Sequence, residues 1–317
     1  MEFIKRAIAL VFFLLLPALV NANQNHEKKI IKIITNNWTS QIVLSQVTGE
    51  IFKYMGYPVK YLPSSISDQW GALSHGLGDV QVEVWEGTMA DMFKRMVKEG
   101  QIVNAGTHSA TTREEWWYPD YVEEVCPGLP DWRALKECSS QFQTEFSAPF
   151  GTYFSGPWEK PDAARIRALV LDFKVKILKD GDELWRVLEA ADKIKKPVIL
   201  FNWTPNWVES VYAGKFVEFP DYEPDCETNP SWGLNEAFTH DCGNPKGGWL
   251  KKSASNQFAD SNNCAFRSLQ LINFTNRQIA SAAALVDVDE MTYQEAAEAW
   301  IKANPQVLND WVPKDCR

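Results

Sequence analysis

The chain has 317 residues, of which 23% are charged, and its formal net charge at pH 7 is −9. This negative balance argues against nucleic acid or an anionic membrane as a partner. The length behind an N-terminal leader is sufficient for two lobes of ordinary domain size.

The first residues have the three-part layout of a secretory signal peptide. Lys5 and Arg6 form a short basic stretch, an almost unbroken apolar run covers residues 7–20, and Val20-Asn21-Ala22 has the small-x-Ala form of a cleavage site. The run is too short to cross a bilayer comfortably, which disfavours the alternative of a retained membrane anchor. We therefore expect a signal peptide over residues 1–22 and a mature protein in the periplasm.

The first third of the mature chain alternates predicted strands and helices. Apolar residues at Val43, Val47 and Ile51 recur at helical spacing, whereas residues 79–85 (DVQVEVW) alternate as in a strand. Strands are expected over 29–35, 58–62, 79–85 and 102–107, and helices over 39–56, 67–77 and 88–98. This alternation predicts a parallel α/β sheet.

The middle of the chain repeats the pattern, and the end is helical. Strands are expected over 150–154, 174–178 and 197–203, with an extended piece over 216–219 and helices after Pro161 and over 182–195 and 205–212. Residues 220–265 form a Pro-, Gly- and Asn-rich region in which we expect loops. Two helices, 275–286 and 292–311 with a break at Pro305, close the chain.

This order of elements predicts two α/β lobes, with the chain leaving the first lobe, building the second and returning. We place the crossings near 115–120 and 214–220. The first lobe then comprises 27–115 and 215–317, and the second 116–214. Ligands of open α/β sheets bind outside the carboxyl ends of the strands.

Six cysteines lie behind the leader, none in a Cys-x-x-Cys pair. In an exported chain an even number indicates up to three disulfides. Zinc is the alternative, but the spacing is irregular and no histidine stands beside a cysteine. We expect Cys126–Cys138 and Cys226–Cys242 as local links, and Cys264–Cys316 follows by elimination.

Several of the 14 tryptophans lie where a cleft between lobes is expected. Trp38, Trp85 and Trp203 end or directly follow predicted strands, Trp116 lies at the first predicted crossing, and Trp158 lies in a second-lobe loop. A single tryptophan is usually a core residue, but core residues have no reason to gather after strand ends. We assign the following to packing: Trp70, Trp185, Trp232, Trp249, Trp300 and Trp311.

A group of indoles around one pocket has a specific chemistry. A quaternary ammonium has no N–H to donate, so hydrogen bonds cannot select it. Indole faces carry negative quadrupole density and attract the positive charge spread over its methyl groups. Primary amines are disfavoured, because they leave unsatisfied N–H groups in a dry pocket. The pattern therefore predicts a cage for a small methylated amine.

At these residues the sequence resembles the glycine betaine/choline-type (OpuAC-like) substrate-binding proteins of ABC importers, over essentially the whole mature chain. The matching pieces are NNWTS, VQVEVWEGT, WWYPDYV and VILFNWTP. The loop CETNPSWG and the tail FTNRQIASAAALVDVDEMTYQEAAEAWI resemble a marine-bacterial branch that includes trimethylamine N-oxide binders.

The resemblance implies a two-lobed periplasmic binding fold of type II, in which each lobe is a mixed or parallel sheet flanked by helices and two crossings form the hinge. It implies Trp38, Trp85 and Trp203 as cage walls, Trp116 as the crossing aromatic, and Trp158 in the loop that helps hold the polar end of the ligand. It further implies a membrane permease as partner, a monomeric binding protein, and neither a cofactor nor catalysis.

The polar end of the ligand distinguishes the candidates. The resemblance leads us to expect an acidic residue where Ser40 stands, which disfavours choline. Glu114 or Glu115 would repel the carboxylate of glycine betaine, but could face an ammonium centre or accept a hydrogen bond from a protonated N-oxide. A solvated surface pair is the alternative for these glutamates. We place Glu115 in the site, and we favour trimethylamine N-oxide slightly over glycine betaine.

Two other classes of function remain open. A periplasmic hydrolase would need a nucleophile or an acid–base set, but the four histidines are scattered and no Gly-x-Ser-x-Gly or phosphate loop is present. A sugar-binding protein would also use tryptophan platforms, but it would need more hydrogen-bonding side chains around them. The acidic loop over 221–227 lacks the spacing of an EF-hand, so a solvated loop is favoured over a calcium site.

Overall fold

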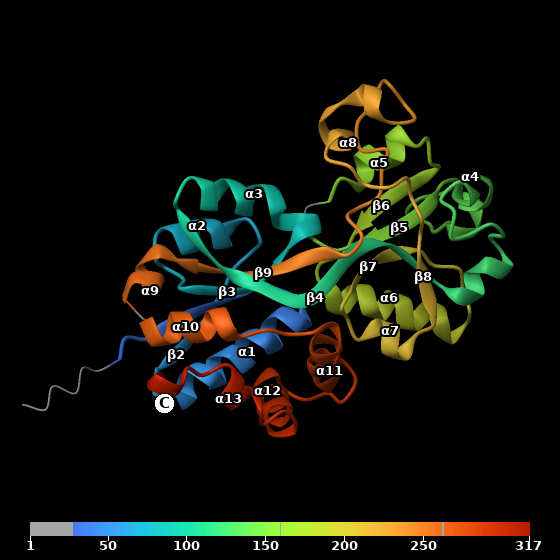
Figure 1. Ribbon diagram of the computed structural model, residues 1–317. Coiled ribbons are helices and arrows are strands. Elements are labelled where there is room, and N and C mark those ends of the chain that lie inside the picture. The colour runs from blue at the N-terminus through green and yellow to red at the C-terminus, as the bar shows by residue number, and fades with distance from the viewer. Residues whose placement is uncertain (1–27, 159, 262) are drawn as a thin grey trace, which may run out of the picture.

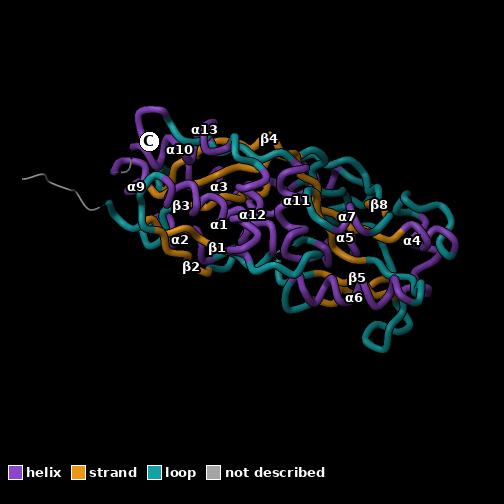
Figure 2. The backbone as a smooth tube through the Cα atoms, turned by 90° about the horizontal axis from the view of Figure 1, so that it is seen from below, coloured by secondary structure: helices purple, strands orange, loops and turns teal. Residues whose placement is uncertain are grey.

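Two sheets that share one long strand form two lobes (Figures 1 and 2). The computed structural model describes residues 28–158, 160–261 and 263–317, and the expected signal peptide lies outside them. Among these residues nine strands follow the order β2-β1-β3-β9-β4-β7-β5-β6, with β8 paired to β4. The mixed, two-lobed α/β fold expected from the sequence is confirmed.

The first lobe contains a five-stranded part of the sheet, with α2 and α3 on one face and α1, α10 and α12 on the other (Figure 1). Its strands are β1 (Ile31–Thr35), β2 (Val59–Pro63), β3 (Val80–Trp85), β9 (Gly248–Ser255) and the first half of β4 (Ile102–Pro119). Its helices are α1 (Thr39–Tyr54), α2 (Asp68–Ser74), α3 (Glu86–Lys98), α9 (Asn256–Ser261), α10 (Asn263–Leu271), α11 (Asn276–Asp287), α12 (Tyr293–Ala303) and α13 (Val307–Asp310). The ends of β1, β2 and β3 lie within two residues of the predicted ones.

The second lobe is built around the other half of β4, with α5 on one face of its sheet and α6 and α7 on the other (Figure 1). Its strands are β5 (Gly151–Ser155), β6 (Phe173–Ile177), β7 (Leu200–Thr204) and β8 (Gly214–Phe216). Its helices are α4 (Ala134–Cys138), α5 (Asp162–Ala168), α6 (Gly181–Lys193), α7 (Val208–Val211) and α8 (Asp225–Thr228).

Strand β4 is the first crossing between the lobes. It pairs with β9 as far as Thr112 and with β7 from Arg113 onwards, both antiparallel. The sequence predicted a strand that ended near residue 107 and a crossing a few residues later. In the structure one continuous strand, β4, covers both segments. Its first part pairs with β9 in the first-lobe sheet, and its later part pairs with β7 in the second-lobe sheet.

Strand β9 was not predicted, and it lies at the centre of the first-lobe sheet between β3 and β4. The prediction of loops throughout 220–265 was therefore wrong for its last third. Two adjacent lysines made this segment look like a solvent-exposed loop, because lysine is rarely buried. In the structure Lys252 is nevertheless only 1% exposed. Its Nζ donates to the backbone oxygens of Gln270, at 3.2 Å, and Ile272.

The return to the first lobe also differs from the expected position at residue 215. Strand β8 pairs with Trp117–Pro119 of β4, so it belongs to the second-lobe sheet. The loop that follows β8 in the chain, residues 217–247, also contacts the second lobe. Arg165 donates to the Cys242 oxygen at 2.8 Å, and Asn235 donates to the Ala168 oxygen at 3.0 Å. The chain re-enters the first lobe only at Gly248, with β9.

The C-terminal helices cover α1. Helices α11 and α12 both contact α1, and each begins with a capping box, at Thr275 with Gln278 and at Thr292 with Glu295. Such boxes satisfy the free N–H groups of a helix start. The predicted break at Pro305 is present between α12 and α13.

The structure pairs the cysteines as Cys126–Cys138, Cys226–Cys242 and Cys264–Cys316, the three pairs suggested by the sequence. In the described part of the chain, no helix is both long enough and apolar enough to cross a membrane.

Candidate ligand-binding site

A pocket lies between the two lobes, and four of the nine described residues that line it are tryptophans. The space between its side chains, counting its opening to solvent, is about 280 Å³. The lining residues are Trp38, Ile66, Trp85, Thr88, Met89, Glu114, Trp158, Phe201 and Trp203.

The two first-lobe indoles are positioned by the ends of parallel strands. Trp38 follows β1 and precedes the first turn of α1, and Trp85 is the last residue of β3 and precedes α3. Both N–H groups donate to the same oxygen, Oε2 of Glu83, at 2.8 and 3.0 Å. Each indole therefore directs its polar edge toward Glu83, and each side chain lines the pocket.

Glu83 is completely buried in β3, and its Oε2 also accepts a hydrogen bond of 3.2 Å from Ser40. Burial raises the pKa of Glu83 to about 7, although the hydrogen bonds from Trp38, Trp85 and Ser40 favour the charged form. The other oxygen, Oε1, has no hydrogen-bond partner among the described residues. A single carboxylate thus fixes two walls of the pocket.

The second-lobe aromatic residues pack against one another. The ring of Trp203, at the end of β7, lies 5.2 Å from Trp158 in an edge-to-face arrangement and 5.7 Å from Phe201. Behind it, Trp185 of α6 lies at 5.1 Å. Aromatic pairs at such distances are mutually stabilising, so this side of the pocket is preformed.

Glu114 of β4 supplies a carboxylate at the crossing between the lobes. Its Oε1 accepts from Thr88 of α3 and, at 2.5 Å, from Lys160 of the second lobe. Its Oε2 is buried and has no partner in the described part of the chain. Glu114 therefore places a carboxylate in the pocket wall, paired with a side chain of the second lobe through one of its oxygens.

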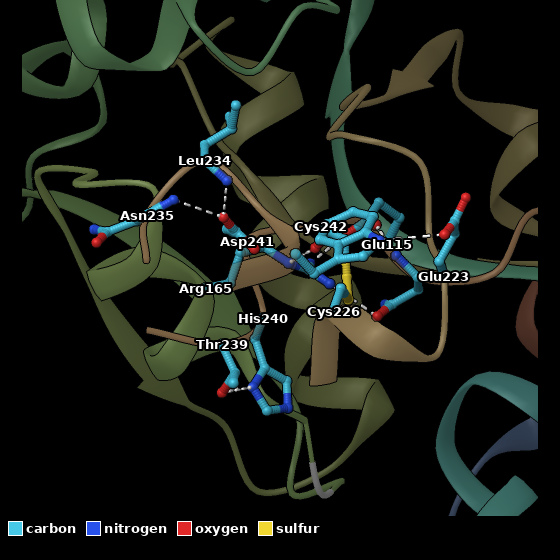
Figure 3. The surroundings of a disulfide bond; sticks show 12 residues. Glu115, Arg165, Glu223, Cys226, Leu234, Asn235, Thr239, His240, Asp241 and Cys242 are labelled. Carbon is cyan, nitrogen blue, oxygen red and sulfur yellow. Dashed lines mark hydrogen bonds and ion pairs between the residues drawn. A yellow bond between two sulfur atoms is a disulfide. The ribbon is translucent and has the colours of Figure 1, made fainter. Parts of the chain in front are cut away.

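The structure places Trp116 and Glu115 elsewhere. Trp116 is fully buried in the second-lobe core, where it stacks on Tyr153 at 3.9 Å and donates to Asp162 at 2.9 Å. Glu115 forms a buried ion pair of 2.5 Å with Arg165, beside the Cys226–Cys242 disulfide (Figure 3). Neither residue lines the pocket, so the expectation that they contact the ligand is not supported by this geometry.

Trp38, Trp85, Trp158 and Trp203, also expected in the site, are brought together in one pocket. Sequence reasoning missed Phe201, Met89 and Ile66, which look like core residues in their segments. Phe201 could have been found, because it precedes Trp203 by two positions and so points to the same side of β7. Nothing in the sequence identified Glu83 as the partner of Trp38.

An aromatic pocket between two hinged lobes defines a class of protein, the two-lobed binding proteins that enclose a small ligand. Residues 29–303 match the family model of the substrate-binding domain of ABC-type glycine betaine transport systems. The chain belongs to this family, and it is a substrate-binding protein of an ABC transporter rather than an enzyme.

Comparisons with individual proteins agree with this assignment. The chain is 38% identical over 304 residues to the trimethylamine N-oxide-binding protein of Pelagibacter ubique (strain HTCC1062), covering 92% of each chain. Lactococcal OpuAC complexed with glycine betaine matches with a TM-score of 0.69 at 17% identity, covering 90% of this chain and 100% of the other. A choline-binding protein in complex with choline gives 0.69 at 16% identity, with 90% and 93% covered. These two solved structures support the fold.

Proposed function

We propose that the chain binds a small methylated amine in the pocket between its lobes, with trimethylamine N-oxide favoured over glycine betaine and choline. The observation that carries the proposal is the group of four indoles, two from each lobe, around one pocket. Three of them direct their N–H groups to protein oxygens on Glu83 and Asn37. Such walls offer aromatic faces, which suit a methyl-covered cation.

The magnitudes are sufficient for useful affinity. A cation over an indole face contributes ~0.5–2 kcal/mol, so three or four faces contribute roughly 1.5–8 kcal/mol. Micromolar binding requires about 8 kcal/mol. Burial of three methyl groups adds about 2.4 kcal/mol, at about 0.8 kcal/mol for each, so cation–π contacts in the upper part of their range reach this value.

The relative at 38% identity supports trimethylamine N-oxide as the preferred ligand, since its name specifies that compound. Glu114 adds to the preference. Its carboxylate belongs to the pocket wall, which disfavours the carboxylate of glycine betaine more than the single oxygen of the N-oxide. The resemblance leads us to expect an acidic residue at position 40 of a choline site. Position 40 is a serine, which hydrogen-bonds Glu83, so choline is less favoured.

In the cell we expect the mature protein to work in the periplasm as a monomer. The lobes close over the ligand, and the closed form docks on a membrane permease. Closure is driven by differential affinity, because only the closed form presents walls from both lobes. A sugar-binding function is less well supported, since no arginine, aspartate or asparagine among the described residues lines the pocket.

A calorimetric panel tests the proposal. Purified mature protein is titrated with trimethylamine N-oxide, glycine betaine, choline, carnitine and, as a rival class, glucose. We expect micromolar or tighter binding of a methylated amine, strongest for trimethylamine N-oxide, and no heat with glucose. Binding of the sugar alone would refute the proposed ligand class. A preference for betaine or choline would overturn the ligand ranking only.

A further inference from the structure

We infer that Lys160 is a positioning residue that holds the two lobes together over a bound ligand without touching the ligand. This inference rests on the proposed function, because it presupposes that the lobes close over a methylated amine. It concerns a buried lysine behind the pocket wall, which no motif in the sequence identified.

The side chain of Lys160 connects the second lobe to the first. Lys160 lies in the second-lobe loop between β5 and α5, and its Nζ donates to the hydroxyl of Thr88, in the first turn of α3 of the first lobe. The same Nζ lies 2.5 Å from Oε1 of Glu114, on the strand that crosses between the lobes. Thr88 in turn donates to that Oε1. These three side chains form one cluster, which we call the latch.

The latch is buried, although it contains two charges. The side chains of Lys160 and Glu114 are 3% and 7% exposed. The ring of Phe201 covers another side of the ammonium, with its centroid 4.7 Å from Nζ. Lysine is almost never buried unless it is paired. Because Thr88 belongs to the first lobe, the ammonium has its full set of partners only while the lobes are together.

The latch lies between the pocket and a larger space outside it. This outer cavity lies between α3 and loops of the second lobe, with Asp91 on one side and Tyr222 on the other, and holds about 1740 Å³ counting its opening to solvent. Thr88 lines both spaces, Lys160 lines the outer cavity, and Glu114 lines the pocket. The latch is therefore part of the wall that separates a bound ligand from the outer cavity.

A second contact of the same loop has the same direction. Trp158 donates to Asn37, so the loop between β5 and α5 contacts the first lobe at two points. Both points lie beside first-lobe walls of the pocket, because Asn37 directly precedes Trp38 and Thr88 follows Trp85 by three positions. Trp158 is itself a wall of the pocket, whereas Lys160 acts from behind the wall.

The variant Thr88→Val tests the latch, because it removes the first-lobe hydroxyl and leaves the pair of Lys160 and Glu114 in place. We expect trimethylamine N-oxide to bind roughly tenfold or more weakly in calorimetry, since a hydrogen bond to a charged group is lost. The latch forms only after the ligand has entered, so stopped-flow fluorescence should show faster dissociation and little change in association. Thr88→Ser, which keeps the hydroxyl, should recover most of the loss.

A direct contact between Thr88 and the ligand would also weaken binding in Thr88→Val, and a double-mutant cycle with Lys160→Met separates the two causes. If the latch is responsible, Thr88→Val costs clearly less affinity in the Lys160→Met background than in the wild type, because its partner is already gone. Lys179→Met is the control for Lys160→Met, since Lys179 is in the same lobe with its side chain 87% exposed. It should leave the affinity unchanged.

Two results would overturn the inference. One is an equal loss for Thr88→Val in both backgrounds, and the other is a loss that lies entirely in slower association. A wild type that binds neither trimethylamine N-oxide, glycine betaine nor choline would instead refute the proposed function, and with it the latch that rests on it.

Discussion

The indole nitrogen of Trp158, in the second lobe, donates a hydrogen bond of 3.2 Å to the side-chain oxygen of Asn37 in the first. Trp158 is also a wall of the pocket, and Asn37 directly precedes another wall, Trp38. One of the contacts that join the lobes is therefore made by a wall of the pocket. If the lobes close over a ligand, as we propose, this contact forms as the pocket is completed.

Removing this contact should weaken ligand binding modestly. In Asn37→Ala the closed form loses one hydrogen bond, which contributes about 0.5–1.5 kcal/mol, so affinity should fall roughly two- to tenfold. Isothermal titration with trimethylamine N-oxide measures the change. Asn309→Ala, at an exposed position in α13 of the first lobe, is the control. An unchanged affinity in Asn37→Ala would show that this contact does not stabilise the closed form.

Trp203 and Trp116 should respond differently to substitution. Trp203→Ala removes a wall that also supports Trp158, so affinity should fall at least tenfold while the protein remains folded. Trp116→Phe should leave affinity unchanged but lower the free energy of unfolding, because Trp116 stacks on Tyr153 outside the pocket. Calorimetry and denaturant unfolding of both variants separate the two effects. A large loss of affinity in Trp116→Phe would place that residue in the site after all.

Glu83 should make the stability of the protein depend on pH. Burial raises its pKa from 4.5 to about 7, so the folded state holds the proton more tightly than the unfolded state. Its contribution to stability is fully present below pH 4.5 and is lost as the pH rises through about 7. The loss amounts to roughly 3 kcal/mol, at 1.36 kcal/mol for each pKa unit.

The variant Glu83→Gln isolates this effect, because glutamine keeps an acceptor for the two indoles but does not titrate. The difference in unfolding free energy between wild type and variant should shift by roughly 2.5 kcal/mol against the wild type between pH 5 and pH 8. Other buried titrating groups, such as Asp287 and Lys252, are present in both proteins and cancel. Urea unfolding at the two pH values measures the difference. A difference that stays constant would mean that Glu83 keeps the same charge throughout.

The sequence predicted the strands and helices whose apolar residues form a clear pattern. The runs that form β1, β3 and β7 are continuous, so their ends and the tryptophans after them could be located. Strand β9 could not be recognised from its sequence. The hydrogen-bond acceptors that allow Lys252 to be buried are backbone oxygens of α10 and of the residue after it. Local periodicity does not contain such partners.

The site shows the same limit. From the sequence, Trp116 and Trp203 were both expected at the cleft between the lobes. Because β4 continues into the second-lobe core, Trp116 contacts Asp162 of α5 there. Trp203, near the end of β7, lines the pocket. Glu114 and Glu115 are neighbours, and only the Arg165 contact shows which one belongs to the core. Glu83 meets Trp38 across 45 positions of sequence.

The disulfide Cys264–Cys316 should contribute more stability than Cys226–Cys242, and neither should affect the pocket. Their closed loops differ, with sequence separations of 52 and 16. Loop-closure entropy predicts losses of about 4 and about 3 kcal/mol when the links are removed. Double serine variants examined by thermal unfolding and calorimetry test this order. A loss of ligand affinity in the Cys264/Cys316 variant would reveal a coupling that the geometry does not predict.

The most direct test of the cage is a crystal structure of the mature protein with trimethylamine N-oxide. We expect the ligand nitrogen between the lobes, within about 6 Å of the ring centroids of Trp38, Trp85 and Trp203. Density for the ligand outside this pocket, or indoles that turn their edges rather than their faces to it, would contradict the account.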